Sequence, residues 1–538
     1  MILNSSMIDK KIESILLILI SIFFLFLSFY FINSFHNFGA DFSQYIQHAI
    51  NISHGVSYDT QVTVNEIAFS FSSLNDDTPN MYPPLLPWVL SFLYEIFGFD
   101  IKTFKVYNIL ALLLMGYACY LYFSVENQKK FSIIALIIVL FSIPLFRFQN
   151  FILSDLLFAC LFTWSILFYR KYEIQNNYLS LIAFLIFASA ATLTKSIGLI
   201  LFLSALTLGA IKLKMKHVLI IFLISVVFLF YTRGFLFSSV DGVHWFNDGS
   251  NSLDFNFANE SIDEKLYSIF LSFSVLCEIF FYNPLHLLKS YGGVLGHLSN
   301  SLVSFFIITL YILFKFRNNS NKKSKFDKFL LIVKKINFVD VVFFYYFFFV
   351  MVFLLDIIIG EAAHHRRYYF PLVLPMLYFL FYVGGYLLPI MQEKFSVGSF
   401  KYAIYIALSS FVIANILFVF NYKSPESTNG AFTGPTVEIY EYIKKNTNEE
   451  DIIIFRKPRL MSLMTMRRSV KKIDFLEKNL DIQQGEIWIV DNTKGRLETN
   501  YIHNGKIENY EDLINSNFVY SEEVFRNQWF KIFKTDWL

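Results

Sequence analysis

Several ionisable side chains stand next to long apolar blocks of this chain, where they are suited to chemistry at a membrane surface. Asp41 follows the first apolar block, Asp155 opens a later one, and Lys195 interrupts a third. Arg366 and Arg367 directly precede another apolar block. A carboxylate can act as the general base on a hydroxyl. Cations stabilise a departing phosphate, and arginine binds phosphate with a rigid fork. The set therefore suits transfer of a sugar from a lipid phosphate to a hydroxyl.

The elements that must position these residues are membrane-spanning helices. The chain has 538 residues, of which 55% are hydrophobic and 16% charged, whereas soluble domains carry roughly 25% charged residues. Its apolar residues form blocks of the length that crosses a bilayer, about 20 residues. The net charge of +3 gives no indication of nucleic-acid binding. No phosphate-binding Walker loop or dinucleotide fingerprint is visible, so coupling to ATP is not expected.

Hydropathy predicts eleven spans. Their approximate ranges are 13–35, 104–124, 131–147, 151–170, 178–193, 196–212, 217–236, 297–316, 338–359, 368–390 and 402–421. The apolar stretch 178–211 would be about 51 Å long as one helix, so it is predicted to cross twice with a turn near Thr194–Lys195. Two apolar segments, Pro84–Phe97 and Leu266–Tyr282, are predicted as interfacial or re-entrant helices.

Most lysines and arginines of the short loops gather on one side of the predicted spans, which predicts a cytoplasmic N-terminus. An odd number of spans then places residues 422–538 outside.

We predict an all-α polytopic domain, 1–421, with outer loops at 36–103 and 237–296. A small extracytoplasmic α/β domain, 422–538, should follow it. Within that domain the pattern predicts a helix at Thr436–Lys445 and strands at Asp451–Phe455, Glu486–Val490 and Asn517–Val519. The few cysteines favour a bacterial plasma membrane.

Four stretches resemble the GT-C glycosyltransferases that use polyprenyl-phosphate sugars, in particular the protein O-mannosyltransferases and the lipid A aminoarabinose transferases. They are Gly-Ala-Asp-Phe-Ser-Gln-Tyr at 39–45, Tyr-Pro-Pro-Leu-Leu-Pro at 82–87, Ser-Asp-Leu at 154–156 and Arg-Arg-Tyr-Tyr-Phe-Pro at 366–371. The resemblance implies a GT-C fold and an inverting transfer from a polyprenyl-phosphate sugar. It points to Asp41 as the catalytic base. Expected substrate-binding residues are Asp155, Lys195, Arg366, Arg367 and Tyr82.

The expected partners are the lipid-linked sugar donor, membrane lipids and a lipid, glycan or protein acceptor; nucleic acid is not expected. The sugar and the acceptor do not follow from the resemblance. No cofactor is expected. His48, His54, His364 and His365 match no standard zinc spacing, so no metal is expected either.

Each candidate residue also has a simpler explanation on sequence alone. Asp41 and Asp155 are suited to cap helices, and Lys195 to reach lipid headgroups. The two arginines and Tyr82 are suited to anchor spans at the interface.

The alternative function is a transporter or flippase for a lipid-linked sugar. Transporters tend to carry polar residues near the bilayer midplane and repeated halves, and this sequence shows few of the former and none of the latter. A non-catalytic scaffold would leave the clustered charges without a purpose.

Overall fold

The computed structural model describes residues 5–37, 40–55, 83–126, 128–212, 221, 276, 292–316, 335–347, 366–394, 397–421, 430–448, 451–455, 457–470, 486–492, 501–503, 506–508 and 521–535. The chain divides into two compact units. The first unit comprises Met1–Ile32, Val106–Asn150 and Ser154–Asn421, and the second comprises Asn33–Lys105, Phe151–Leu153 and Tyr422–Leu538. The stretch Asn33–Lys105 thus belongs to the same unit as the C-terminal region.

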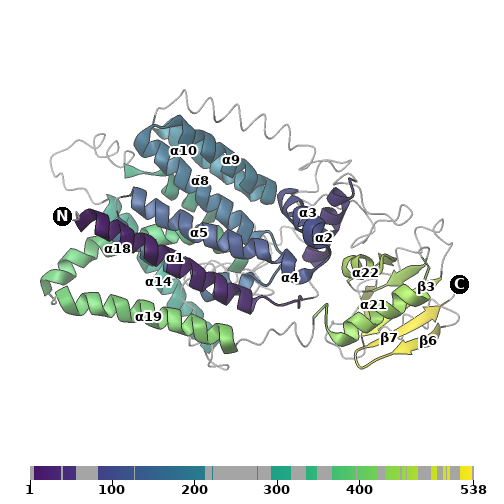
Figure 1. Cartoon of the computed structure of the whole chain (residues 1–538). Helices are drawn as coiled ribbons and strands as arrows, with labels where there is room; N and C mark the ends of the chain where they lie inside the picture. The colour runs from purple at the N-terminus through teal and green to yellow at the C-terminus, as the bar shows by residue number, and fades with distance from the viewer. Residues whose placement is uncertain are drawn as a thin grey trace. The chain divides into compact units, whose positions relative to one another are not determined.

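The first unit is built from helices. They are α1 (Ser5–Phe31), α5 (Val106–Val125), α6 (Lys129–Leu140), α7 (Ile143–Phe148), α8 (Asp155–Gln175), α9 (Tyr178–Thr194), the short 3-10 helix η2 (Ser196–Gly198), α10 (Leu199–Ile211), α14 (Gly292–Phe316), the 3-10 helix η5 (Arg366–Leu372), α18 (Val373–Lys394) and α19 (Val397–Asn421). Helix α8 packs against α5, α9 and α10 (Figure 1). It is therefore central to the packing of this unit.

Three helices among the described residues are long and apolar enough to cross a membrane. They are Lys11–Phe31, Ile101–Val125 and Arg367–Leu387, and shorter apolar helices accompany them. Apolar side chains on α1, including Ile15, Ile22, Phe26 and Phe29, are exposed, as lipid-facing side chains are. The total of eleven spans stays a prediction, because most of 217–236, all of 348–359 and most of the segment Leu266–Tyr282 lie outside the described residues.

One predicted span is interrupted in the structure, and one long apolar stretch divides where the sequence predicts. The predicted span 131–147 is broken, because α6 ends at Leu140 and α7 starts at Ile143 with Pro144 in its first turn. Proline lacks the amide hydrogen that a continuing helix needs. The stretch 178–211 divides as predicted: α9 ends at Thr194, and Lys195 has an extended backbone. A Cβ on Gly198 would lie 2.7 Å from the backbone nitrogen of Thr192, so the close approach of the two segments requires glycine there.

The second unit begins with α2 (Ala40–Ser53), α3 (Leu85–Phe97) and the short α4 (Ile101–Phe104). Helices α2 and α3 pack side by side (Figure 1). Helix α3 has 13 residues, about 20 Å at 1.5 Å per residue, which is shorter than the hydrocarbon core of a bilayer. Its C-terminus is capped by Gly98, whose φ of 71° favours glycine. Its extent matches the short helix predicted at Pro84–Phe97.

The C-terminal part of the second unit contains a mixed sheet and two helices. They are α21 (Gly434–Asn446), β1 (Ile452–Ile454), α22 (Pro458–Thr465), β2 (Arg468–Val470), β3 (Ile487–Asn492), β4 (Tyr501–His503), β5 (Lys506–Glu508), β6 (Ser521–Arg526) and β7 (Phe530–Thr535). The five-stranded sheet has the order β2-β1-β3-β7-β6, and β4 pairs with β5. Strand β1 runs parallel to β2 and β3, and the β3–β7 and β7–β6 pairs are antiparallel.

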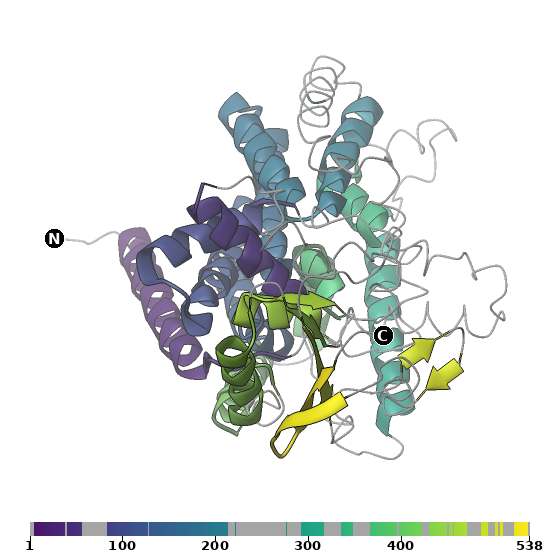
Figure 2. The same cartoon turned by 90° about the vertical axis from the view of Figure 1, so that its right-hand side faces the viewer.

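Helix α21 covers part of this sheet (Figure 2). The Tyr442 hydroxyl donates to the carbonyl of Val524 at 3.0 Å, and its ring contacts Phe525. Helix α22 contacts α2, which joins the α/β part to the helices earlier in the same unit. The predicted helix Thr436–Lys445 and strands Asp451–Phe455 and Glu486–Val490 coincide with α21, β1 and β3. The predicted strand Asn517–Val519 lies outside the described residues.

Candidate functional site

The first candidate side chain of the first unit is Asp155, the first residue of α8. Its side chain is almost fully buried, with 3% of the residue exposed. A buried carboxylate needs compensating donors or cations, because loss of hydration is costly. It has them in two cations that come from segments far away in the sequence.

Lys195 supplies the closer cation. Its Nζ donates to Oδ1 of Asp155 at 2.6 Å. The residue stands between α9 and η2, where the helix stops: its amide donates to the Ala191 carbonyl, and its own carbonyl accepts from the Gly198 amide. The tight turn that Gly198 permits thus places an ammonium group beside the first turn of α8. The side chain of Lys195 stays 22% exposed.

Arg367, in η5, supplies the second cation. Its Nη1 lies 3.9 Å from Oδ2 of Asp155, and its side chain is 21% exposed. Tyr368 lies between the two cations. Lys195 Nζ is 5.0 Å and Arg367 Cζ 5.1 Å from the centroid of its ring. Arg367 also donates to the Tyr368 hydroxyl at 3.2 Å.

Tyr346 fixes η5 from a further helix of the first unit, because its hydroxyl donates to the Tyr368 carbonyl at 2.8 Å. We call Asp155, Lys195, Arg367 and Tyr368 the Asp155 cluster. It contains one buried carboxylate and two partly exposed cations, so its formal charge is positive. A cluster with two partly exposed cations at the end of a helix bundle has the properties of an anion-binding site. Tyr368 and Tyr346 were not predicted, although Tyr368 adjoins the predicted arginines.

Asp41 lies in the second unit, in the first turn of α2, with its side chain partly exposed. It is thus in a different unit from the Asp155 cluster. Arg366 is the first residue of η5, and its side chain is outside the described part. Tyr82 lies outside the described residues altogether. Among the described residues, no group of three or more His, Cys, Asp and Glu side chains is arranged to hold a metal ion.

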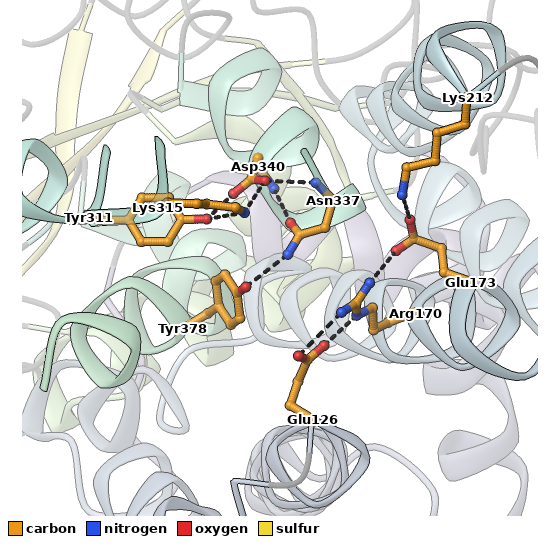
Figure 3. A network of polar contacts seen from close by, with 9 residues as sticks. All are labelled: Glu126, Arg170, Glu173, Lys212, Tyr311, Lys315, Asn337, Asp340 and Tyr378. Carbon is orange, nitrogen blue, oxygen red and sulfur yellow. Dashed lines mark hydrogen bonds and ion pairs between the residues drawn. The ribbon is translucent and has the colours of Figure 1, made fainter. Parts of the chain in front are cut away.

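A second charged group occupies the opposite end of α8 and was missed at the sequence level (Figure 3). Arg170 is 15 residues after Asp155, about 22 Å along the helix. Its guanidinium pairs with Glu126, which follows α5, and donates to Glu173 at 3.2 Å. Lys212, which follows α10, donates to the other oxygen of Glu173 at 2.7 Å. These ion pairs tie the ends of α5, α8 and α10 together.

A neighbouring network centres on Asp340 (Figure 3). Its carboxylate pairs with Lys315 of α14 and accepts from the Tyr311 hydroxyl. Asn337 and Asp340 form a capping box at the start of helix Phe338–Phe347: each side chain accepts from the other's backbone amide, at 3.2 and 2.8 Å. Asn337 also donates to the Tyr378 hydroxyl of α18 at 2.9 Å. The network therefore joins three helices.

Both networks balance their charges internally. Three cations, Arg170, Lys212 and Lys315, face the three carboxylates of Glu126, Glu173 and Asp340. Lys315 and Asp340 are 4% and 3% exposed. Networks whose charges balance in this way have no net charge for an anionic ligand, so their role is to fix helix positions. The Asp155 cluster, in which two cations lie around one buried carboxylate, is the better candidate for a binding site.

Comparison with known proteins assigns the chain to a fold class. No protein-family model and no curated protein sequence matches it. Solved structures of GT-C membrane glycosyltransferases do match, and the chain has the GT-C fold.

The Archaeoglobus fulgidus oligosaccharyltransferase, solved with a tethered acceptor peptide, aligns with a TM-score of 0.52 and 11% identity over 89% of this chain and 69% of that chain. ArnT from Cupriavidus metallidurans in the apo state aligns with a TM-score of 0.46 and 12% identity over 98% of both chains. The same ArnT bound to undecaprenyl phosphate aligns with a TM-score of 0.45 and 12% identity, over 97% of this chain and 98% of that chain.

Proposed function

We propose that this protein is a membrane glycosyltransferase that moves a sugar from a polyprenyl-phosphate donor to a hydroxyl of a lipid, glycan or protein, with inversion at the anomeric carbon. The reaction takes place on the extracytoplasmic side of a bacterial plasma membrane, with the N-terminus in the cytoplasm. The GT-C fold supports the class of reaction. The observation that carries the proposal is the Asp155 cluster, in which one buried carboxylate holds two partly exposed cations.

In the proposed reaction the acceptor hydroxyl oxygen attacks the anomeric carbon while the bond from that carbon to the phosphate oxygen breaks. The phosphate leaves with the electron pair as polyprenyl phosphate, and the hydroxyl proton passes to the carboxylate of Asp41. A positioned general base typically contributes about 10²-fold to 10⁴-fold. Asp41 is partly exposed at the first turn of its helix, which is compatible with access to a substrate hydroxyl.

The donor phosphate is proposed to bind at the Asp155 cluster. Lys195 and Arg367 each keep about a fifth of their side chain exposed. Negative charge accumulates on the phosphate as the glycosidic bond breaks, and fixed cations stabilise it. Asp155 holds the two cations in place before the substrate arrives, so little reorganisation is needed on binding. Arg366 and Tyr82 stay proposed substrate contacts on the strength of the sequence resemblance.

The test is an assay with the purified full-length protein in detergent or liposomes. It is incubated with a panel of undecaprenyl- and dolichyl-phosphate hexoses and pentoses, each with candidate lipid, glycan and peptide acceptors. Release of polyprenyl phosphate together with a glycosylated acceptor is expected for one donor. The variant Asp41→Asn should insert normally and lose this release. Movement of an intact lipid-linked sugar across the liposome membrane, with no release, would instead establish a flippase.

A further inference from the structure

His36 is a buried histidine to which the proposed reaction assigns no role. It lies between α1 and α2 in the second unit and is 2% exposed. Its ring stacks on Phe42, with the ring centroids 3.9 Å apart and an angle of 29° between the planes. Its Nε2 accepts a hydrogen bond from the Ile152 amide at 3.0 Å, and its carbonyl accepts from the Ala431 amide at 2.9 Å. One residue thus joins three segments that are distant in the sequence.

The hydrogen bonds define the protonation state of the ring. Because Nε2 accepts from a backbone amide, it carries no proton, and the proton is on Nδ1, 3.1 Å from the Asn37 carbonyl. Burial, together with the nearby Lys105 ammonium, lowers the pKa of His36 to about 3. The imidazole is therefore neutral at physiological pH, and both of its nitrogens are engaged.

Lys105 secures the same stretch of backbone from the other side. Its ammonium is fully buried and donates to the carbonyls of Asn33 at 2.9 Å and Phe35 at 2.5 Å. A buried ammonium that bonds to backbone carbonyls holds them more firmly than a neutral donor would. The segment Asn33–Asn37 is therefore fixed at both ends, and the imidazole of His36 is held in one orientation.

The imidazole of His36 contacts the first turn of α2. Phe42 is 1% exposed, directly follows Asp41, and also contacts Phe432. The face of His36 covers the face of Phe42, so the imidazole limits the rotation and tilt of the turn that carries the Asp41 carboxylate. We infer that His36 is a positioning residue for Asp41, and that it acts through its stack on Phe42 and its hydrogen bond to Ile152. The inference rests on the proposed role of Asp41 as the base.

Two variants separate the two contacts of the imidazole. His36→Phe keeps an aromatic ring for Phe42 and removes the acceptor for the Ile152 amide. His36→Gln keeps an acceptor near the position of Nε2 and removes the ring. Each should lower kcat about 10-fold to 100-fold while KM for the polyprenyl-phosphate sugar that the wild-type protein uses stays within about twofold, since small misplacements of a catalytic group act on the chemical step.

Thr447→Val is the matched control for lost stability. Thr447 is buried in the same unit and donates to the Ile443 carbonyl at 2.7 Å, within the C-terminal α/β part. At the same fall in Tm, it should leave kcat unchanged. An equal fall in kcat for Thr447→Val and the His36 variants would overturn the inference, and so would wild-type kcat in both His36 variants.

A double-variant cycle tests whether His36 acts through Asp41. Asp41→Glu displaces the carboxylate, so a further displacement caused by His36→Phe should cost less than it does in the wild type. Losses that multiply in the double variant would show that the two residues act independently and would overturn the inference.

The outcomes that test the proposed function and the His36 inference are distinct. An active Asp41→Asn variant removes the proposed base and the His36 inference with it, whereas inactive Asp41→Asn with unaffected His36 variants removes the inference alone.

Discussion

Nζ of Lys195 lies 2.6 Å from Oδ1 of Asp155, although 40 residues separate the two in the sequence. The carboxylate is buried and the ammonium is partly exposed. Asp155 therefore holds the Lys195 ammonium in a fixed position that a ligand can reach. The same carboxylate lies 3.9 Å from Nη1 of Arg367, so it orients two cations that come from separate segments of the chain.

Removing the Lys195 ammonium should weaken donor binding. A hydrogen bond to a charged group contributes about 1.5–3 kcal/mol, so Lys195→Met should raise KM for the polyprenyl-phosphate sugar about 10-fold to 100-fold. Lys195→Arg should recover part of the loss. The control is Lys444→Met, which removes an exposed cation from α21 and should leave KM unchanged. Equal KM values for Lys195→Met and wild type would exclude a phosphate contact by Lys195.

Asp41→Asn should retain the fold and lose activity. The amide has the size of the carboxylate but cannot accept the hydroxyl proton, so kcat should fall by about 10²-fold or more. The same variant should bind the donor as tightly as wild type, because Asp41 is proposed to act on the acceptor. Single-turnover release of polyprenyl phosphate measures the first quantity, and binding of a labelled donor measures the second. Activity within a few-fold of wild type would contradict the role of Asp41.

Breaking the Lys315–Asp340 pair should destabilise the first unit without a specific effect on transfer. Removal of one partner of a buried pair costs about 3–5 kcal/mol, because the other charge stays buried without compensation. Lys315→Met and Asp340→Asn should therefore each lower Tm in detergent, and Asp340→Asn also removes one half of the capping box with Asn337. The double variant should lose less than the sum of the two. Additive losses in Tm would mean that the pair contributes no coupling.

The sequence was most informative where simple lengths and charges decide the structure. The stretch 178–211 is longer than one bilayer crossing, and the turn is found at Lys195 as expected. The break between α6 and α7 was missed, although Pro144 was visible as its cause. The roles of Asp155, Lys195 and Arg367 as site residues were predicted from residue type, but their mutual contact depends on how α8, α9 and η5 pack, which no local pattern contains.

The charged networks at the other end of α8 were overlooked for a different reason. Arg170, Lys212 and Lys315 belong to the loop cations that predict membrane orientation, and that pattern contains no information about their carboxylate partners. One signal was available: the spacing from Asn337 to Asp340 before an apolar run fits a capping box. His36 carries no local pattern at all, because its partners Phe42, Ile152 and Ala431 meet only in the folded unit.

Gly198→Ala should disturb the turn that presents Lys195. The added Cβ would lie 2.7 Å from the Thr192 nitrogen and 2.9 Å from the Ala191 carbonyl carbon, both backbone atoms that cannot move aside cheaply. We expect a lower Tm and a raised donor KM, in the same direction as for Lys195→Met. Gly384→Ala in α18 is the control, since a Cβ there meets nothing within 4 Å. A Gly198→Ala variant with wild-type Tm and KM would show that the turn tolerates the side chain.

The pH dependence of stability should reveal the buried state of His36. Its pKa is about 3 in the folded protein and 6.5 for an unperturbed histidine, so the unfolded chain binds the proton more readily between these values. The stabilisation is complete above about pH 6.5 and declines as the pH falls toward 3. At pH 5 the loss amounts to about 2 kcal/mol, since each pKa unit is worth about 1.36 kcal/mol.

Tm of the wild type should therefore fall more steeply from pH 7.5 to 5 than that of His36→Phe. Thr447→Val, which changes a buried residue of the same unit that does not titrate, should follow the slope of the wild type. Parallel curves for wild type and His36→Phe would show that His36 takes up its proton in the folded protein as easily as in the unfolded chain, which is incompatible with the hydrogen bond that its Nε2 accepts from Ile152.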